Sequence, residues 1–281
     1  MDDYKAFELS DGARLAYLDQ GAGETIVMLA GWSQSVAQYK HQLGPFSENH
    51  RVVAVDWRGH GRSSKPETGY RLVRFAADLR EFIAGLRLRD VTILAHSTGA
   101  AAVWSYLDSY GTEGIKRLVF VDKGASETAR PDWDKDEADL RGASIATLPD
   151  LATFYENVLR STSLPAAVEL IRRLFTPSYP PEELEWAASE NLLLPRPHAA
   201  ALLWDAAITD LSDVFDKIDV PALVVGAERS LYTADSQRWI ANKLPRGQVE
   251  IFGADEGGSH FMFMENPTRF NEVVLEFLAS S

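Results

Sequence analysis

The segment that most constrains the fold is a serine flanked by small residues, at the point where an apolar run meets a helix-forming stretch. Residues 95–99 read Ala-His-Ser-Thr-Gly, between the apolar run 91–94 and the stretch 100–110. A strand that enters x-x-Ser-x-Gly and continues as a helix predicts a sharp turn, the nucleophile elbow. Such a turn exposes the hydroxyl of Ser97 beside the free N–H groups of a helix start. The alternative is an ordinary surface serine in a strand–helix connection.

Short apolar runs alternate with helical patterns through both ends of the chain. We expect a hairpin over 7–18, strands at 25–29, 51–55, 91–94, 118–121, 222–225 and 248–252, and helices at 72–86, 100–110 and 267–278. The hairpin is expected because Asp11 and Gly12 interrupt an alternating pattern, and the helices because their apolar residues recur at helical spacing. The alternation predicts an α/β fold with a mostly parallel central sheet flanked by helices.

The middle of the chain has a different pattern. Residues 126–213 show helical periodicity without a convincing strand, and several prolines divide the segment into short helices. We expect a helical cap inserted between two strands of one sheet. The core then comprises residues 1–125 and 214–281, and the cap comprises residues 126–213. Most aromatic residues of the cap are expected in its own core, and one or two of them beside a pocket.

Charge and targeting signals exclude several partners. The formal net charge is −13, and such an acidic surface argues against binding to nucleic acid or to an anionic membrane. The first residues lack the basic and apolar regions of a signal peptide, and no apolar run approaches the length of a membrane span. We therefore expect a cytoplasmic protein. The oligomeric state stays open.

The residue types also limit metal and cofactor chemistry. The chain has no cysteine, so it can form neither a disulfide nor a thiolate metal site. No two histidines have the spacing of a helical metal site, and the Gly-Ala-Gly at 21–23 lacks the helix that a nucleotide site needs. We expect neither a metal nor an organic cofactor.

A serine hydroxyl needs a base to become a nucleophile, and His260 is the best candidate. It lies in the glycine-rich loop 256–261, after the last expected strand and before the last expected helix. His96 adjoins the serine but is expected to point away from it, and His60 is expected to have a structural role. The remaining histidines, His41, His50 and His198, are weaker candidates.

The acid that would orient His260 has two candidates. Asp122 directly follows the strand expected at 118–121, at the edge where ligands gather in parallel sheets. Glu228 follows the strand expected at 222–225, and Arg229 and Ser230 come directly after it in the same loop. We favour Asp122, with Glu228 as the alternative. For an oxyanion we expect the backbone N–H groups of Thr98 and Trp32.

Two motifs resemble a known superfamily. Met-Leu-Ala-Gly-Trp-Ser-Gln-Ser at 28–35 and Asp-Trp-Arg-Gly-His-Gly-Arg-Ser-Ser at 56–64 identify the chain as a member of the α/β-hydrolase superfamily. The resemblance covers the chain outside the insertion and implies the α/β-hydrolase fold. That fold orders its catalytic residues serine, acid, histidine, and it places the histidine loop over the elbow. Ser97, Asp122 and His260 follow this order.

Within the superfamily the chain looks most like the cofactor-independent 3-hydroxy-4-oxoquinoline and quinaldine 2,4-dioxygenases. The resemblance lies in Gly31-Trp32, in the aromatic-lysine pair at 39–40, in the Trp-Arg-Gly-His turn at 57–60, in the position of Asp122, and in the sequence around His260. Thr98 departs from the pattern, because those enzymes tend to have a histidine after the serine.

The resemblance implies a ring-opening dioxygenase with a small aromatic substrate and O₂. His260 would remove the proton from the 3-hydroxyl, and Ser97 would only donate a hydrogen bond. The alternative is a carboxylesterase or lactonase, in which Ser97 attacks the substrate with the help of His260 and Asp122. A third reading is a non-catalytic receptor that uses the same pocket for a small ligand.

Overall fold

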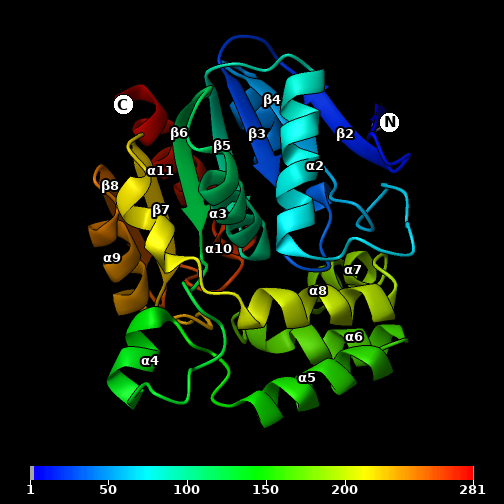
Figure 1. Cartoon of the computed structure of the whole chain (residues 1–281), viewed down its shortest axis with the longest axis vertical. Coiled ribbons are helices and arrows are strands. Elements are labelled where there is room, and N and C mark those ends of the chain that lie inside the picture. Colours follow the sequence, from blue (N-terminus) through cyan, green and yellow to red (C-terminus); the bar gives the residue numbers. More distant parts are fainter. Residues whose placement is uncertain (1–2, 281) are drawn as a thin grey trace.

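Eight strands form a single sheet in the order β1-β2-β4-β3-β5-β6-β7-β8 (Figure 1). The computed structural model describes residues 3–280. The strands are β1 Lys5–Glu8, β2 Arg14–Gln20, β3 Thr25–Leu29, β4 Arg51–Val55, β5 Val91–His96, β6 Ile115–Val121, β7 Ala222–Ala227 and β8 Gly247–Phe252. Pairs β1–β2 and β2–β4 are antiparallel, and the other pairs are parallel. The predicted mostly parallel sheet is confirmed.

The central strands are buried along nearly their whole length. Every residue of β5 and β7 is buried, and so are all but the first residue of β3 and β4. Strands covered by helices on both faces have no water-facing side, so they read as continuous apolar runs. The predicted hairpin is formed by β1 and β2, with Gly12 in its turn at a φ of 82°.

Helices cover both faces of the sheet (Figure 1). One apolar layer packs α2, α3 and α9 against the sheet, and a second layer packs α1, α10 and α11 against the opposite face. The helices of these layers are α1 Leu43–Ser47, α2 Leu72–Gly85, α3 Thr98–Tyr110, α9 Ala234–Lys243, α10 Met262–Glu265 and α11 Pro267–Ser280, with the short 3-10 helices Val36–Tyr39 and Ser212–Lys217. No helix among residues 3–280 is long and apolar enough to cross a membrane.

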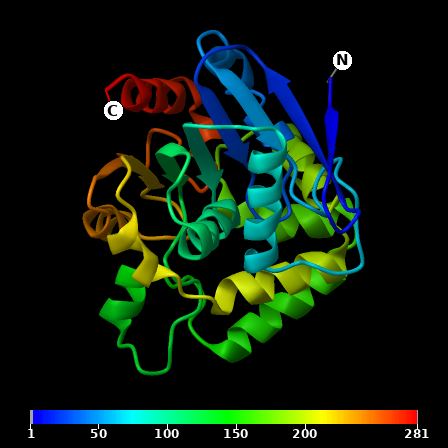
Figure 2. The ribbon, with the colours of Figure 1, turned by 45° about the horizontal axis from the view of Figure 1, so that its top comes forward.

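The chain between β6 and β7 forms five α-helices beyond the carboxyl ends of the parallel strands, as both ribbon views show (Figures 1 and 2). They are α4 Lys135–Arg141, α5 Leu148–Arg160, α6 Leu164–Ile171, α7 Pro181–Asn191 and α8 Arg196–Ile208, with the 3-10 helix Arg172–Leu174. Prolines occupy the first turns of α5 to α8, where a missing N–H leaves no helical bond unmade. The division into core and cap at residues 126 and 213 stays a prediction.

Hydrogen bonds attach α8 to the loop after β3. The indole N–H of Trp32 donates to the Ala199 carbonyl oxygen at 2.7 Å, and the buried guanidinium of Arg196 donates to the Ser33 hydroxyl at 2.9 Å. Burial lowers the pKa of Arg196 to about 10. These contacts hold the helical segment over the end of the sheet that carries Ser97.

Candidate active site

Ser97 lies at the turn between β5 and α3. Its φ is 53° and its ψ is −125°, a strained conformation for a residue with a side chain. The turn is tight because α3 approaches the end of β3: a Cβ on Gly99 would lie 2.6 Å from the Ala30 carbonyl oxygen. The strand, turn and helix expected over residues 91–110 are therefore present, with the serine at the carboxyl edge of the sheet.

A chain of hydrogen bonds joins Ser97, His260 and Asp122. Nε2 of His260 lies 3.1 Å from the Ser97 Oγ, and its Nδ1 lies 2.6 Å from the Asp122 Oδ2. The exposed fractions of Ser97, His260 and Asp122 are 6%, 4% and 0%. With Nδ1–H donating to the carboxylate, Nε2 is left as an acceptor for the serine proton. The arrangement can therefore withdraw a proton from the hydroxyl of Ser97.

The carboxylate of Asp122 is sealed from solvent and shared between two donors. Its Oδ2 accepts from His260 and from the hydroxyl of Ser230, whereas its Oδ1 has no partner among residues 3–280. Burial raises the pKa of Asp122 above its ordinary value, and the hydrogen bond from His260 opposes that rise. Asp122 itself has a φ of 48°, in the left-handed region that a residue with a side chain rarely adopts.

The loop after β7 contributes a hydroxyl to the site. Glu228, the alternative acid, is exposed and accepts the backbone N–H of Ala254 at 2.9 Å. Ser230 instead donates to the Asp122 carboxylate. The sequence places Ser230 in the same loop as Glu228, the alternative acid. It gives no sign that the Ser230 hydroxyl bonds to Asp122.

His96, which was expected to point away from Ser97, contacts His260. Its ring centroid lies 4.5 Å from that of His260, and its Nε2–H donates to the His260 carbonyl oxygen at 3.0 Å. Burial holds the pKa of His96 well below its usual range, so the ring is neutral. His96 also lines the cavity in front of Ser97, and it ties the loop of His260 to the end of β5.

The two residues expected to bind an oxyanion, Thr98 and Trp32, line the same cavity as Ser97. Among residues 3–280, neither the Thr98 N–H nor the Trp32 N–H has a hydrogen-bond partner. Thr98 is the first residue of α3, and the Trp32 loop is held by the next N–H, because Ser33 donates to Nε2 of His60 at 3.1 Å. His60 thus has a structural contact, as expected. The two free N–H groups of Thr98 and Trp32 can each donate a hydrogen bond to an anion.

A small cavity lies in front of the triad, between the end of the sheet and the helical segment. Its volume is about 50 Å³, and Ser97, His260, Trp32 and Thr98 are among the residues that line it. Phe154 of α5 lines it on the side of the helical segment, with its ring centroid 6.4 Å from that of Trp32. Aromatic side chains from the Trp32 loop and from the helical segment therefore line the cavity.

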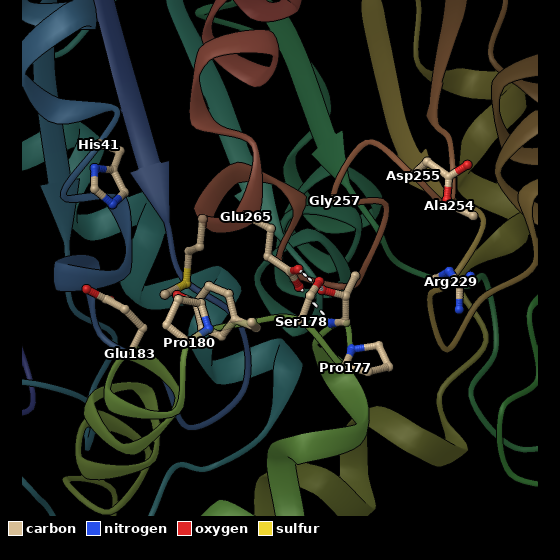
Figure 3. A pocket seen from close by; sticks show the side chains of 13 residues that line it. His41, Pro177, Ser178, Pro180, Glu183, Arg229, Ala254, Asp255, Gly257 and Glu265 are labelled. Atoms are coloured by element: carbon tan, nitrogen blue, oxygen red, sulfur yellow. Dashed lines mark hydrogen bonds between the residues drawn. The ribbon is translucent and has the colours of Figure 1, made fainter.

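A second, open groove of about 650 Å³ lies away from the triad (Figure 3). His41, Glu183 and Glu265 line it with the loop at Ala254 and Asp255, and Figure 3 shows these side chains spread around the groove. Among the part of the chain that the structure describes, no group of three or more histidine or acidic residues could hold a metal ion. The groove contains no counterpart of the Ser97 and His260 pair.

The chain is similar to proteins of one family along most of its length. The family model described as alpha/beta hydrolase fold matches residues 24–267. A non-heme chloroperoxidase, CPO-A1 of Kitasatospora aureofaciens, is 26% identical over 282 residues, which cover 95% of this chain and 97% of the relative.

Two solved structures share the fold over nearly the whole chain. The bromoperoxidase from Bacillus anthracis superimposes with a TM-score of 0.89 at 22% identity, covering 99% of this chain and 100% of its own. The esterase EaEST from Exiguobacterium antarcticum superimposes with a TM-score of 0.88 at 22% identity, covering 98% of this chain and 99% of its own. At this identity the two structures show the shared fold, and neither of them is a 2,4-dioxygenase.

Proposed function

The chain belongs to the alpha/beta hydrolase fold family, and we propose that it is a serine hydrolase that cleaves small carboxylic esters or lactones. The observation that carries the proposal is the continuous hydrogen-bond chain from Ser97 through His260 to Asp122, next to a small cavity. A serine, an imidazole and a carboxylate in this order supply the nucleophile, the base and the group that orients the base.

The proposed reaction has two steps. In the first, Ser97 Oγ attacks the substrate carbonyl while Nε2 of His260 takes its proton, and Asp122 stabilises the charged imidazole. The N–H groups of Trp32 and Thr98 stabilise the oxyanion, and His260 returns the proton to the leaving alcohol. In the second step, a water molecule gives a proton to His260 and attacks the acyl group, which releases the acid and restores Ser97.

The size of the cavity supports a small ester. The cavity beside Ser97 measures about 50 Å³, which is room for a short acyl group next to the hydroxyl. It shares Ile145, Phe154 and Arg173 with an open groove of about 680 Å³, where the rest of the substrate can lie. The chloroperoxidase and esterase similarities point the same way, and we therefore place the hydrolase before the 2,4-dioxygenase.

The experiment measures two reactions with the same protein samples. We expect wild-type protein to hydrolyse p-nitrophenyl acetate, and Ser97→Ala and His260→Ala to lose at least about 10³-fold in kcat, because each acts only as part of the triad. Oxygen uptake is followed in parallel with a 3-hydroxy-4-quinolone in metal-free buffer. Ser189→Ala, which changes an exposed serine of α7, is the matched control and should retain full activity.

The two enzymatic readings give opposite results. Oxygen uptake that survives Ser97→Ala, without ester hydrolysis by the wild type, would exclude the hydrolase and favour the dioxygenase. If neither reaction occurs, the proposal of an ester hydrolase is also wrong.

A further inference from the structure

A buried ion pair lies beside the triad and has no part in the reaction proposed above. Lys123 directly follows Asp122, and its ammonium contacts Oε1 of Glu127. The exposed fractions of Lys123 and Glu127 are only 3% and 7%. Removing two charges from water carries a large desolvation penalty, so a buried pair adds little to stability compared with apolar side chains of the same size. A role in the cavity would account for its presence.

The two oxygens of Glu127 have different surroundings. Oε1 accepts from Lys123 and from the phenol O–H of Tyr232, the latter at 3.2 Å. Both of these bonds are to Oε1, and Oε2 has no hydrogen bond from the residues between 3 and 280. Glu127 and Tyr232 line the same cavity as Ser97 and His260. The wall of the cavity therefore presents a carboxylate oxygen with an unused capacity to accept a hydrogen bond.

The charges around Glu127 favour a neutral donor over a cation. Lys123 already compensates the charge of the carboxylate. A second cation, the guanidinium of Arg173, lines the cavity and packs over the ring of Phe154 at 5.1 Å from its centroid. An ammonium group entering the cavity would meet the guanidinium of Arg173 and a Glu127 carboxylate whose charge is already paired, whereas a hydroxyl group is not repelled. A hydroxyl is therefore the donor that fits.

The position of Tyr232 indicates which part of the substrate carries this hydroxyl. The ring of Tyr232 packs edge-on against His260, with 5.9 Å between the ring centroids, while its O–H binds Glu127. In the proposed hydrolysis, His260 returns its proton to the leaving alcohol, so the alcohol part of the ester lies against His260. Glu127 is thus on the side of the alcohol.

We propose that Glu127 is a specificity residue whose Oε2 binds a hydroxyl group on the alcohol part of the substrate, so that the preferred substrates are small esters of diols or polyols. This inference rests on the proposed hydrolase function and names its substrate class. A hydrogen bond to a charged acceptor is worth roughly ten-fold or more in affinity.

The test compares two esters of nearly the same shape, 2-hydroxyethyl acetate and propyl acetate, by acid release in a pH-stat. We expect wild-type kcat/KM to be roughly ten-fold or more higher for the hydroxyethyl ester. In Glu127→Gln, Oε1 can still accept from Tyr232, while an NH₂ group, which leaves only a weaker neutral hydrogen bond to the substrate hydroxyl, replaces the charged acceptor Oε2, so this ratio should fall towards one. Glu276→Gln, on the exposed side of α11, is the matched control and should keep the wild-type ratio.

A second variant covers the case in which Glu127→Gln leaves Lys123 unpaired and fails to fold. Lys123→Met combined with Glu127→Gln removes both charges at similar volume, and its ratio should also fall towards one. A thermal unfolding transition shows that each variant is folded.

Three results would contradict either the role of Glu127 or the proposed hydrolase function. Hydrolysis of both esters at equal wild-type kcat/KM would overturn this inference and leave the hydrolase function standing. A preference seen only for a hydroxyl on the acyl part, tested with ethyl glycolate against ethyl propionate, would overturn it too. Absence of hydrolysis of every ester would contradict the proposed function itself.

Discussion

At the scale of single residues, the position of the acid depends on a partner from a different loop. Asp122 follows β6, while the hydroxyl of Ser230 reaches its Oδ2 from the loop after β7. The hydrogen bond from Ser230 lowers the pKa of Asp122 and so favours its charged form, against the effect of burial. The two loops end side by side because β6 and β7 are neighbouring parallel strands.

Because the two loops lie side by side, we predict that a carboxylate in the loop after β7 can partly replace Asp122. Asp122→Asn should lower kcat for ester hydrolysis by roughly 10⁴-fold, because the amide cannot stabilise the charged His260. Adding Ser230→Asp to this variant places a carboxylate next to the same site, and we expect at least ten-fold recovery. The measurement is kcat with p-nitrophenyl acetate. Equal activity of the single and double variants would show that the loop after β7 cannot orient His260.

At the scale of elements, the elbow depends on how closely α3 approaches β3. Gly99 lies in the first turn of α3, and a Cβ there would be 2.6 Å from the Ala30 carbonyl oxygen and 3.1 Å from that of Leu29. Both are backbone atoms, so neither can move aside as a flexible side chain could. The same backbone continues into the loop that carries the Trp32 N–H.

We therefore predict that Gly99→Ala damages both stability and activity. The methyl group must displace α3 or the end of β3, at a cost of about 1–3 kcal/mol in the free energy of unfolding. The displaced oxyanion loop should lower kcat by at least ten-fold. Gly44→Ala in α1 is the control, because a Cβ there meets nothing within 4 Å. Chemical denaturation and ester hydrolysis measure the two effects, and wild-type values for Gly99→Ala would refute the packing argument.

At the scale of the whole molecule, folding keeps a titratable ring neutral at the junction of the sheet and the helical segment. His60 is buried, its Nδ1–H donates to the Arg58 carbonyl oxygen at 3.0 Å, and its Nε2 accepts from Ser33. Burial lowers the pKa of His60 to about 4, whereas an unfolded histidine titrates near 6.5. Between these values the unfolded chain binds the proton and the folded protein does not.

The free energy of unfolding should therefore fall as the pH falls from about 6.5 towards 4, by up to about 1.4 kcal/mol per pH unit from His60. His60→Gln can still accept from Ser33 but does not titrate, so its stability should depend less on pH in this window. Urea unfolding at pH 7, 6 and 5 measures the difference. Burial raises the pKa of Asp56 to about 6, so protonation of Asp56 stabilises the folded protein as the pH falls. This effect is the same in the wild type and in His60→Gln, so it cancels in the comparison. Parallel curves for the two proteins would exclude this role of His60.

Most elements of the fold follow from local patterns in the sequence. The strand at 25–29 and the helix expected at 72–86 are found at Thr25–Leu29 and Leu72–Gly85. Such segments are predictable because the spacing of apolar residues and the turn residues at their ends act within one element. The serine turn at Ser97 is local in the same sense, since its strand, glycine and helix are consecutive.

Contacts between distant segments could not be predicted in this way. The hydrogen bonds of Ser230 to Asp122 and of His96 to the backbone of His260 join residues that are 108 and 164 positions apart. The pairing of Glu127 with Tyr232 across 105 positions is of the same kind. No periodicity in the sequence reports these distances, because they arise from the order of the strands and from the packing of the helical segment.

The sequence by itself determined the α/β architecture, the serine turn and the types of group that the site needs, because each depends on neighbours along the chain. The tertiary structure alone decided the volume of the cavity, the second donor to Asp122 and the free oxygen of Glu127. Cavities and unsatisfied acceptors are what remains after all side chains have packed, so they exist only when distant segments meet.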